Sequence, residues 1–385
     1  DSRQSRGLGD VYKRQNVQYV ATLNPSAGSF SVADRLQRHF ATLATPFPDM
    51  AVLKHIYTSI MGGHLEVFEQ PVRDALGSIV DAACAVHQAV ADEFLPTAVK
   101  FHYQWNLRAM ASVFQGLTRM RPAPRFSTAL QMARLWSHET KRVYGDRMVD
   151  EKDVSRFESI MVRETGAHLG ALEQKDLHAE PNLFGSFVDE DEGAQRSYVP
   201  FDGWEQLGGA LERKLAEYNE NYAMMNLVLF KQAMEHLCRI SRILDTPRGN
   251  AMLVGVGGSG KQSLTRLAAH IGGHELFQIK LTASYGIGDF KEELRTAFSR
   301  VGAKSMPTVF LFTDQQIFDE RALVYINDLL AQGCPPGLFA EEDKDELLNA
   351  VRAEAKAAGV FDSRENLWRF FVDKVRADLH VVCCM

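Results

Sequence analysis

The chain has 385 residues, of which 45% are hydrophobic and 24% are charged, and its formal net charge is −6 at pH 7. This length predicts two or three domains, and the composition is that of an ordinary globular protein with a buried core. The small negative charge gives no electrostatic basis for a nucleic-acid partner, and the apolar runs fall short of the about 18 residues that span a bilayer, so neither nucleic acid nor membrane is expected as a partner.

The first part of the chain changes character at Asn16. Residues 1–15 are polar and rich in Gly and Arg, so we expect them to be extraneous to the fold or disordered. The apolar run Asn16–Leu23 then predicts a buried strand, which ends at Asn24 and Pro25. From about residue 49 to residue 117 the apolar residues recur at helical spacing.

Further helical patterns cover the middle of the chain, at residues 127–143, 154–170, 205–221 and 224–244. Residues 176–203 have the composition of a loop, and the acidic cluster at 189–192 predicts a solvated surface. His138, beside Trp136 and Glu139, is expected to pack on a helix face rather than to act in catalysis. The five cysteines show no C-x-x-C spacing, so a metal site is not expected and reduced, buried thiols are.

Beyond Gly249 the pattern alternates between strands and helices. The strands are predicted at 251–254, 277–281, 309–313 and 379–384, and the helices at 263–270, 289–301 and 320–331. Alternation with short connections predicts an α/β fold with a largely parallel sheet. The chain is thus expected to contain a mainly helical region followed by an incomplete parallel sheet.

A glycine-rich segment connects the first of these strands to the first helix. It fits the phosphate-loop pattern G-x-x-x-x-G-K-[ST] everywhere except at the last position, where Gln262 stands. Glycines permit positive φ and close approach to a phosphate, and the N-terminus of the following helix attracts the anion. The alternative is a flexible Gly-rich turn. The predicted nucleotide-binding residues are Gly255, Gly257, Gly258, Ser259, Gly260, Lys261, Gln262 and Ser263.

Two positions needed for ATP hydrolysis depart from a complete site. A Ser or Thr hydroxyl normally ligates Mg²⁺, and Gln262 is a poor substitute for it. Ser263 cannot take its place, because the next residue of a helix points about 100° away. Asp314 ends a buried strand and is a candidate ligand of Mg²⁺, or alternatively a helix N-cap. Gln315 stands where many ATPases place the Glu that activates water, so binding is predicted and efficient turnover is not.

Several segments together resemble an axonemal dynein heavy chain of the outer-arm beta type. They are Asn24–Phe30, Arg35–Phe40, Phe101–Tyr103 with Asn106–Arg108, Leu135–Thr140, Val143–Asp150 and Leu253–Leu267. The resemblance implies a fragment of a motor ring in which six AAA+ modules lie on one polypeptide. On this basis residues 16–48 end the large subdomain of the third module, and 49–203 form its helical AAA+ lid and a connection. Residues 204–250 are linker helices, and 251–385 begin the fourth module.

The resemblance also implies roles for residues outside the phosphate loop. Asn24 matches the sensor-one residue of the third module, with an Asn-Pro turn as the alternative. Arg35 or Arg38 matches an arginine finger, unless it only satisfies a helix end. Arg108 matches the sensor-two position of the lid, with surface ion pairing as the alternative.

The leading hypothesis is therefore a piece of a ciliary motor ATPase in the cytoplasm and axoneme that binds ATP or ADP, with Mg²⁺ less firmly supported. Its expected partners are the neighbouring AAA+ modules, and, through the parent protein, dynein intermediate and light chains and microtubules. The alternatives are a free-standing P-loop ATPase and a structural AAA+ unit that holds no nucleotide.

Overall fold

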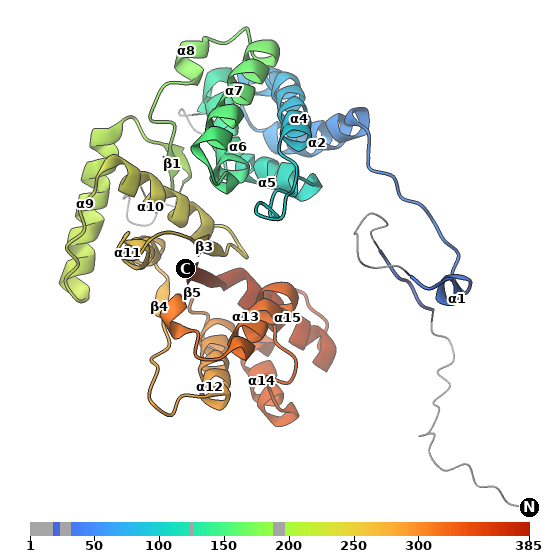
Figure 1. Ribbon diagram of the computed structural model, residues 1–385, viewed down its shortest axis with the longest axis vertical. Coiled ribbons are helices and arrows are strands. Elements are labelled where there is room, and N and C mark those ends of the chain that lie inside the picture. The colour runs from blue at the N-terminus through green and yellow to red at the C-terminus, as the bar shows by residue number, and fades with distance from the viewer. Residues whose placement is uncertain (1–17, 24–31, 123–125, 188–196) are drawn as a thin grey trace, which may run out of the picture. The chain divides into compact units, whose positions relative to one another are not determined.

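The computed structural model (Figure 1) describes residues 18–23, 32–122, 126–187 and 197–385. It separates into two units, residues 1–49 and residues 50–385. Residues 1–17, Asn24 and the acidic cluster at 189–192 lie outside the described residues, so the predictions made for them stay predictions. Within the described part of the first unit the regular structure is one short helix, α1 (Asp34–Gln37), and every residue from 32 to 45 is exposed.

The predicted strand at 16–23 is wrong over its described residues. Residues 18–23 have no regular structure and are exposed, including Val20, which is 93% exposed. A strand needs a neighbour for its backbone N–H and C=O groups, and the described part of the first unit offers no second strand. The strand was predicted from apolar composition alone, and composition does not show whether a neighbouring strand is available for pairing.

The second unit begins with a bundle of helices, as the sequence predicted. Its longer helices follow the apolar periodicity closely: the predicted 127–143 is observed as 129–143, and the predicted 154–170 as 151–168. The helices are α2 (Met50–Leu65), α3 (Gln70–Asp74), α4 (Leu76–Glu93), α5 (Leu107–Leu117), α6 (Ala129–Val143), α7 (Glu151–His168) and α8 (Gln174–Leu177).

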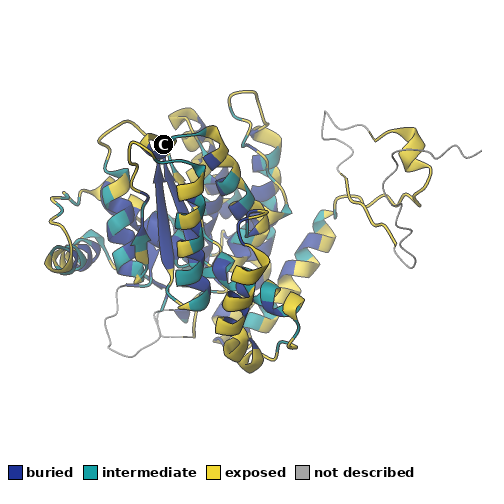
Figure 2. Ribbon diagram, turned by 90° about the horizontal axis from the view of Figure 1, so that it is seen from below, coloured by how far each residue is buried: buried dark blue, intermediate teal, exposed yellow. Residues whose placement is uncertain are grey.

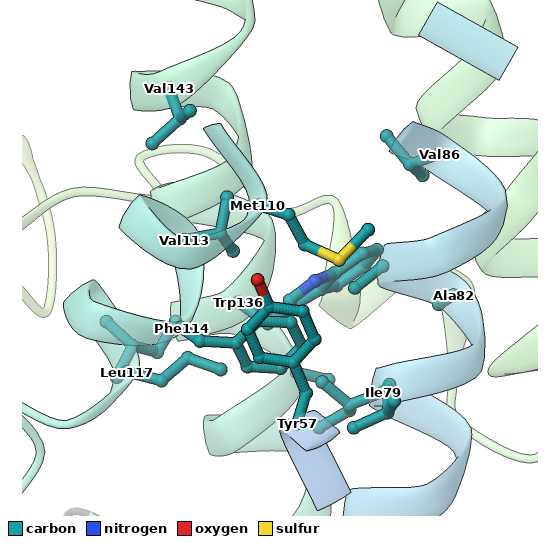
Figure 3. Close-up of a cluster of buried hydrophobic side chains, with 14 of the residues drawn as sticks. Tyr57, Ile79, Ala82, Val86, Met110, Val113, Phe114, Leu117, Trp136 and Val143 are labelled. Carbon is teal, nitrogen blue, oxygen red and sulfur yellow. The ribbon is translucent and has the colours of Figure 1, made fainter. Parts of the chain in front are cut away.

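One apolar core holds this bundle together. Trp136 is completely buried at its centre, and the rings of Tyr57 and Phe114 stack with their centroids 4.2 Å apart (Figure 3). Side chains from α2, α4, α5 and α6 meet there, so each helix buries the apolar stripe that its periodicity predicted.

A short antiparallel pair, β1 (Phe184–Gly185) with β2 (Val199–Pro200), and two further helices lead to the sheet. The helix α9 spans Trp204–Asn221, as predicted, and α10 spans Lys231–Leu244. The predicted start of α10 at Met224 is wrong. Residues 224–230 are irregular and alternate between exposed and partly buried side chains, so the segment lies extended on the surface instead of coiling.

The sheet has four parallel strands in the order β3-β6-β5-β4, which confirms the predicted α/β class. The strands are β3 (Ala251–Leu253), β4 (Glu275–Phe277), β5 (Thr308–Thr313) and β6 (Leu379–Cys384). Figure 2 shows the buried central strands, β5 and β6, in dark blue between helices whose outer surfaces are exposed. The last strand in sequence, β6, lies between β3 and β5.

Successive side chains of the strands enter two different apolar cores. Leu311 and Val382 face the core that includes α9, α10 and α11 (Lys261–Gly272), whereas Phe310 and Val381 face the opposite core. That second core is covered by α12 (Ile287–Phe298), α13 (Glu320–Gln332), α14 (Glu341–Ala357) and α15 (Arg364–Asp378). A π-helical turn, Ser299–Ala303, extends α12.

Two predictions in the α/β part need correction. The strand predicted at 277–281 is observed at 275–277, because β5 pairs with β4 only from Glu275 to Phe277. The helices α14 and α15 were not predicted, although both carry buried apolar residues at helical spacing, such as Leu348 with Val351 and Phe371 with Val375.

Candidate nucleotide site

The glycine-rich segment joins β3 to α11 with the geometry that the phosphate-loop pattern predicts. Gly258 and Gly260 have φ values of 80° and 79°, in the left-handed region that disfavours residues with a side chain. Gly260 is the residue before the first turn of α11, and Lys261 is the first residue of that helix. The free N–H groups of this first turn therefore point toward the loop, as an anion site requires.

The ammonium group of Lys261 folds back on the loop. It donates to the carbonyl oxygens of Gly255 and Val256, the second at 2.8 Å, and to Ser259 Oγ at 3.3 Å. These acceptors hold the cation over the loop until a stronger acceptor replaces them. A phosphate group would be such an acceptor, because a charged oxygen binds an ammonium more strongly than a neutral carbonyl does.

The sheet brings the end of β5 close to this loop. In the strand register Cys384 lies between Leu253, which precedes the loop, and Thr313, which precedes Asp314. Burial raises the pKa of the Cys384 thiol, while the charge of Lys261 lowers it and that of Asp314 raises it. Both charges therefore lie within electrostatic reach of one buried sulfur, on the same edge of the sheet.

Asp314 opens a single 3₁₀ turn, Asp314–Gln316, at the end of β5. Its carboxylate is exposed, and Oδ1 accepts the N–H of Gln315 at 2.9 Å. The alternative role as a helix N-cap is not what the structure shows, because Thr313 holds the cap position of this turn. Gln315 is exposed, with a neutral amide where a carboxylate would activate water.

Gln316 was not singled out from the sequence, yet it is the best-anchored residue of the turn. It is 7% exposed, its Oε1 accepts the N–H of Thr313 at 2.9 Å, and its Nε2 donates to the carbonyl of Ile279 at 2.7 Å. A glutamine directly after a buried strand is a weak sequence signal for such a role. Its side chain joins the end of β5 to the segment that follows β4.

Gln262 stands at the position of the usual Mg²⁺-ligating hydroxyl, and it differs in exposure from the neighbouring Ser263. Gln262 is exposed and Ser263 is partly buried, at the second and third positions of α11. The carboxylate of Asp314 and the amide oxygen of Gln262 are oxygen ligands of the kind that Mg²⁺ accepts. The donor set therefore fits the ion, although it lacks the usual hydroxyl.

The other predicted site residues are not gathered at this loop. Arg35 and Arg38 are exposed in the first unit, where Arg38 Nε donates to the ring of His39 at 3.3 Å. Arg108 is exposed in the first turn of α5, and within the described part of the chain its guanidinium makes no ion pair, so surface ion pairing is not observed for it. Asn24 lies outside the described residues.

His138 packs as the sequence predicted, inside a buried polar network. It is 2% exposed, with its ring bonded to the carbonyl of Asn182 at 2.9 Å and to the hydroxyl of Tyr198 at 3.0 Å, and burial lowers its pKa well below the usual value. Tyr198 donates in turn to Glu139, which also forms an ion pair with Arg242 of α10. This network links the helical bundle to the helix that packs against α11.

Comparison with known proteins gives a family match over two parts of the chain. Residues 225–385 match the family of the P-loop containing dynein motor region D4, and residues 79–178 match the AAA+ lid domain. The flagellar outer-arm dynein beta chain of Chlamydomonas reinhardtii is 47% identical over 96% of this chain. The ciliary dynein beta chain of Tripneustes gratilla is 45% identical over 99% of it.

The chain is a homologue of axonemal dynein heavy chains. It spans only 8% of the length of either relative, so it corresponds to a short stretch of each. Axonemal dynein heavy chain 17 of Homo sapiens is 46% identical to this chain over 98% of this chain's length. The P-loop family to which residues 225–385 belong is a nucleotide-binding one. Among the described helices, none has the length and apolar character needed to cross a membrane.

Proposed function

We propose that this dynein segment holds one nucleotide site of a ciliary or flagellar motor ring, and that the site binds ATP or ADP without efficient hydrolysis. The observation that carries the proposal is the loop itself: Lys261 is held at the N-terminus of α11 between Gly255 and Ser259, on the sheet edge that also carries Asp314. Binding needs the loop, the helix N-terminus and the lysine, and all three are in place.

The weak step in this proposal is turnover, and the reason is chemical. A base that accepts the proton of the attacking water is worth about 10²–10⁴ in rate, and the amide of Gln315 cannot accept that proton. Mg²⁺ would be held by Asp314 with help from Gln262, and when bound it would neutralise phosphate charge. A retained nucleotide would then stabilise the folded chain by mass action.

The wider setting follows from the relatives, whose names place them in the flagellar outer arm and in cilia. We propose that the parent protein works in the axoneme as a microtubule motor. Its neighbouring AAA+ modules would be the direct partners of this segment, and dynein intermediate and light chains and microtubules would be partners of the whole protein. We also propose the module assignments predicted from the sequence: the end of the third large subdomain at 16–48, its lid and a connection at 49–203, linker helices at 204–250, and the start of the fourth module at 251–385. Asn24, Arg35 or Arg38, and Arg108 keep their proposed roles toward nucleotides of the preceding modules.

The test measures nucleotide binding by the 385-residue chain. Binding is detected through the fluorescence of a methylanthraniloyl-ADP probe, with and without Mg²⁺. We expect saturable binding to the unsubstituted chain and an affinity at least tenfold lower in Lys261→Ala. The unsubstituted chain should hydrolyse ATP no faster than Lys261→Ala does. The control is Lys304→Ala, which removes an exposed lysine outside the loop. Unaltered binding in Lys261→Ala would contradict the proposal.

A second candidate function has one observation in its favour. Lys261 donates to carbonyl oxygens of its own loop, and these internal hydrogen bonds are what a purely structural turn would need. The chain would then melt at the same temperature with and without millimolar ADP. A rise in melting temperature with ADP concentration, absent in Lys261→Ala, would exclude this candidate.

A further inference from the structure

Gln316 is a buried polar residue whose two hydrogen bonds have no role in the function proposed so far. Its amide spans two parallel strands at the point where their ladder stops. The last paired residues of β4 and β5 are Phe277 and Phe310, and beyond them the side chain of Gln316 takes over, bonding Ile279 at 2.7 Å and Thr313 at 2.9 Å.

Both partners of Gln316 are themselves fixed. Ile279 is 2% exposed and belongs to the core under α12 and α13, and Thr313 is 2% exposed at the end of β5. The amide therefore closes a ring from the end of β5, around the 3₁₀ turn, and back to β4. A buried amide with satisfied hydrogen bonds resists displacement, because leaving one of its partners unpaired costs free energy.

The geometry of this turn decides where the carboxylate of Asp314 points. Asp314 is the first residue of the turn and Gln316 the third, and the backbone N–H of Ile317 donates to the carbonyl of Asp314 at 3.2 Å. The carboxylate of Asp314 has no anchor on the sheet within the described residues: the one hydrogen bond it makes there is from the adjacent N–H of Gln315. Its direction is thus set through the turn that Gln316 holds.

We infer that Gln316 is a positioning residue for a divalent cation that accompanies the nucleotide: it holds Asp314 in the direction of the phosphate loop. This inference rests on the proposed nucleotide site and adds a residue to it. The proposed role of Gln316 affects binding of the cation and not of the phosphate, since the loop and Lys261 bind phosphate without Asp314. Gln316 variants should therefore lose the gain in affinity due to Mg²⁺ and keep the affinity measured without it.

The experiment measures the Kd of the methylanthraniloyl-ADP probe with EDTA and with Mg²⁺, and takes the ratio of the EDTA value to the Mg²⁺ value, which is the gain in affinity due to Mg²⁺. Gln316→Met keeps the volume and removes both hydrogen bonds, and Gln316→Glu keeps the acceptor for Thr313 but removes the donor to Ile279. We expect the ratio to fall about tenfold in the first and less in the second, with the EDTA value unchanged within about twofold. Gln332→Ala, at an exposed position in α13, is the matched control.

A double-mutant cycle separates positioning from a general structural role. Asp314→Asn removes the carboxylate and should lose the same Mg²⁺ gain, and adding Gln316→Met to it should cost nothing further. Mn²⁺ retained with ADP, counted by electron paramagnetic resonance, should fall in parallel. If Gln316→Met does not fold, Gln316→Glu decides the question in the same assays.

The outcomes distinguish this inference from the function on which it rests. An unchanged ratio in both Gln316 variants overturns the inference and leaves the nucleotide site intact. An equal loss of affinity with EDTA and with Mg²⁺ also overturns it, because that pattern indicates damage to the loop. If the unsubstituted chain binds no probe, with Mg²⁺ or with EDTA, the proposed function and the inference are both overturned.

Discussion

The ion pair between Glu139 and Arg242 joins the core of the helical bundle to α10, so its removal should cost more than any surface pair. Glu139 is 0% exposed, and Arg242 Nε lies 3.1 Å and 3.0 Å from its two carboxylate oxygens. The hydroxyl of Tyr198, at 3.0 Å, is the other donor to the carboxylate. In Arg242→Met the carboxylate would remain buried with one neutral donor.

The expected loss in the free energy of unfolding is about 3–5 kcal/mol, the cost of leaving a buried charge unpaired. The double variant Glu139→Met with Arg242→Met removes both charges and fills the space with apolar groups. Such replacements are often neutral, so the double variant should be more stable than Arg242→Met alone. Non-additivity of this kind is the signature of a direct interaction.

The assay is urea unfolding followed by circular dichroism and tryptophan fluorescence, with Arg321→Met as the control. Arg321 pairs with Asp319 at the exposed start of α13, and its loss should matter far less. A loss below about 1 kcal/mol in Arg242→Met would refute the reasoning, given the size expected for a buried pair. A double variant destabilised by the sum of the two single variants would refute it as well.

Three further predictions follow from the site and its surroundings. Gly260→Ala should cost roughly 1–2 kcal/mol of stability in urea unfolding, because its φ of 79° strains a side chain, whereas Gly257→Ala, with open space around its Cβ position, should cost less. The folded-state pKa of His138 is lowered by burial, so its contribution to stability is complete above the unfolded pKa of about 6.5 and is lost by about 1.4 kcal/mol per pH unit as the pH falls below that value. His138→Gln should reduce this acid sensitivity between pH 7.5 and pH 5.5, and His55→Gln, at an exposed position, should not; equal slopes in the two variants would contradict the assignment. Gln315→Glu should raise the rate of ATP hydrolysis by tenfold or more in a phosphate-release assay, approaching the about 10²–10⁴ that a positioned base supplies, and an unchanged rate would show that another group limits turnover.

The sequence predicted elements best where one local pattern sufficed. The buried run Thr308–Thr313 and the run Leu379–Cys384 were placed within a residue, because each is a mostly apolar strand of six residues. The phosphate loop was predicted together with its flanking strand and helix, since the spacing of its glycines and Lys261 is itself the signal.

Elements that depend on a distant partner were predicted less well. The run 277–281 has strand character, but β5 stops pairing with β4 at Phe310, and beyond it the side chain of Gln316 bonds Ile279 instead. Residues 18–23 have strand character and lack a neighbour in the described part of their unit. In both cases the missing information is pairing, which periodicity does not contain.

The missed helices α14 and α15 are a different case, because their signals were local and present. Ser363 caps α15 by accepting the N–H of Asn366, and three acidic residues fill the first turn of α14. The hydrogen bond from Gln316 to Ile279, by contrast, has no local signal in the sequence. Its partners are 37 residues apart in the chain and meet only because β4 and β5 are neighbours in the sheet.

The position of β6 in the sheet also has a consequence for how the chain acquires its structure. The strands β3 and β5 do not touch each other; each bonds to β6, which is synthesised after both. During translation the phosphate loop would thus be attached to a strand with no lateral neighbour until residues 379–384 arrive. Assembly dominated by such long-range pairing is slow, so substitutions in β6 should delay maturation of the site even where they leave the finished protein stable.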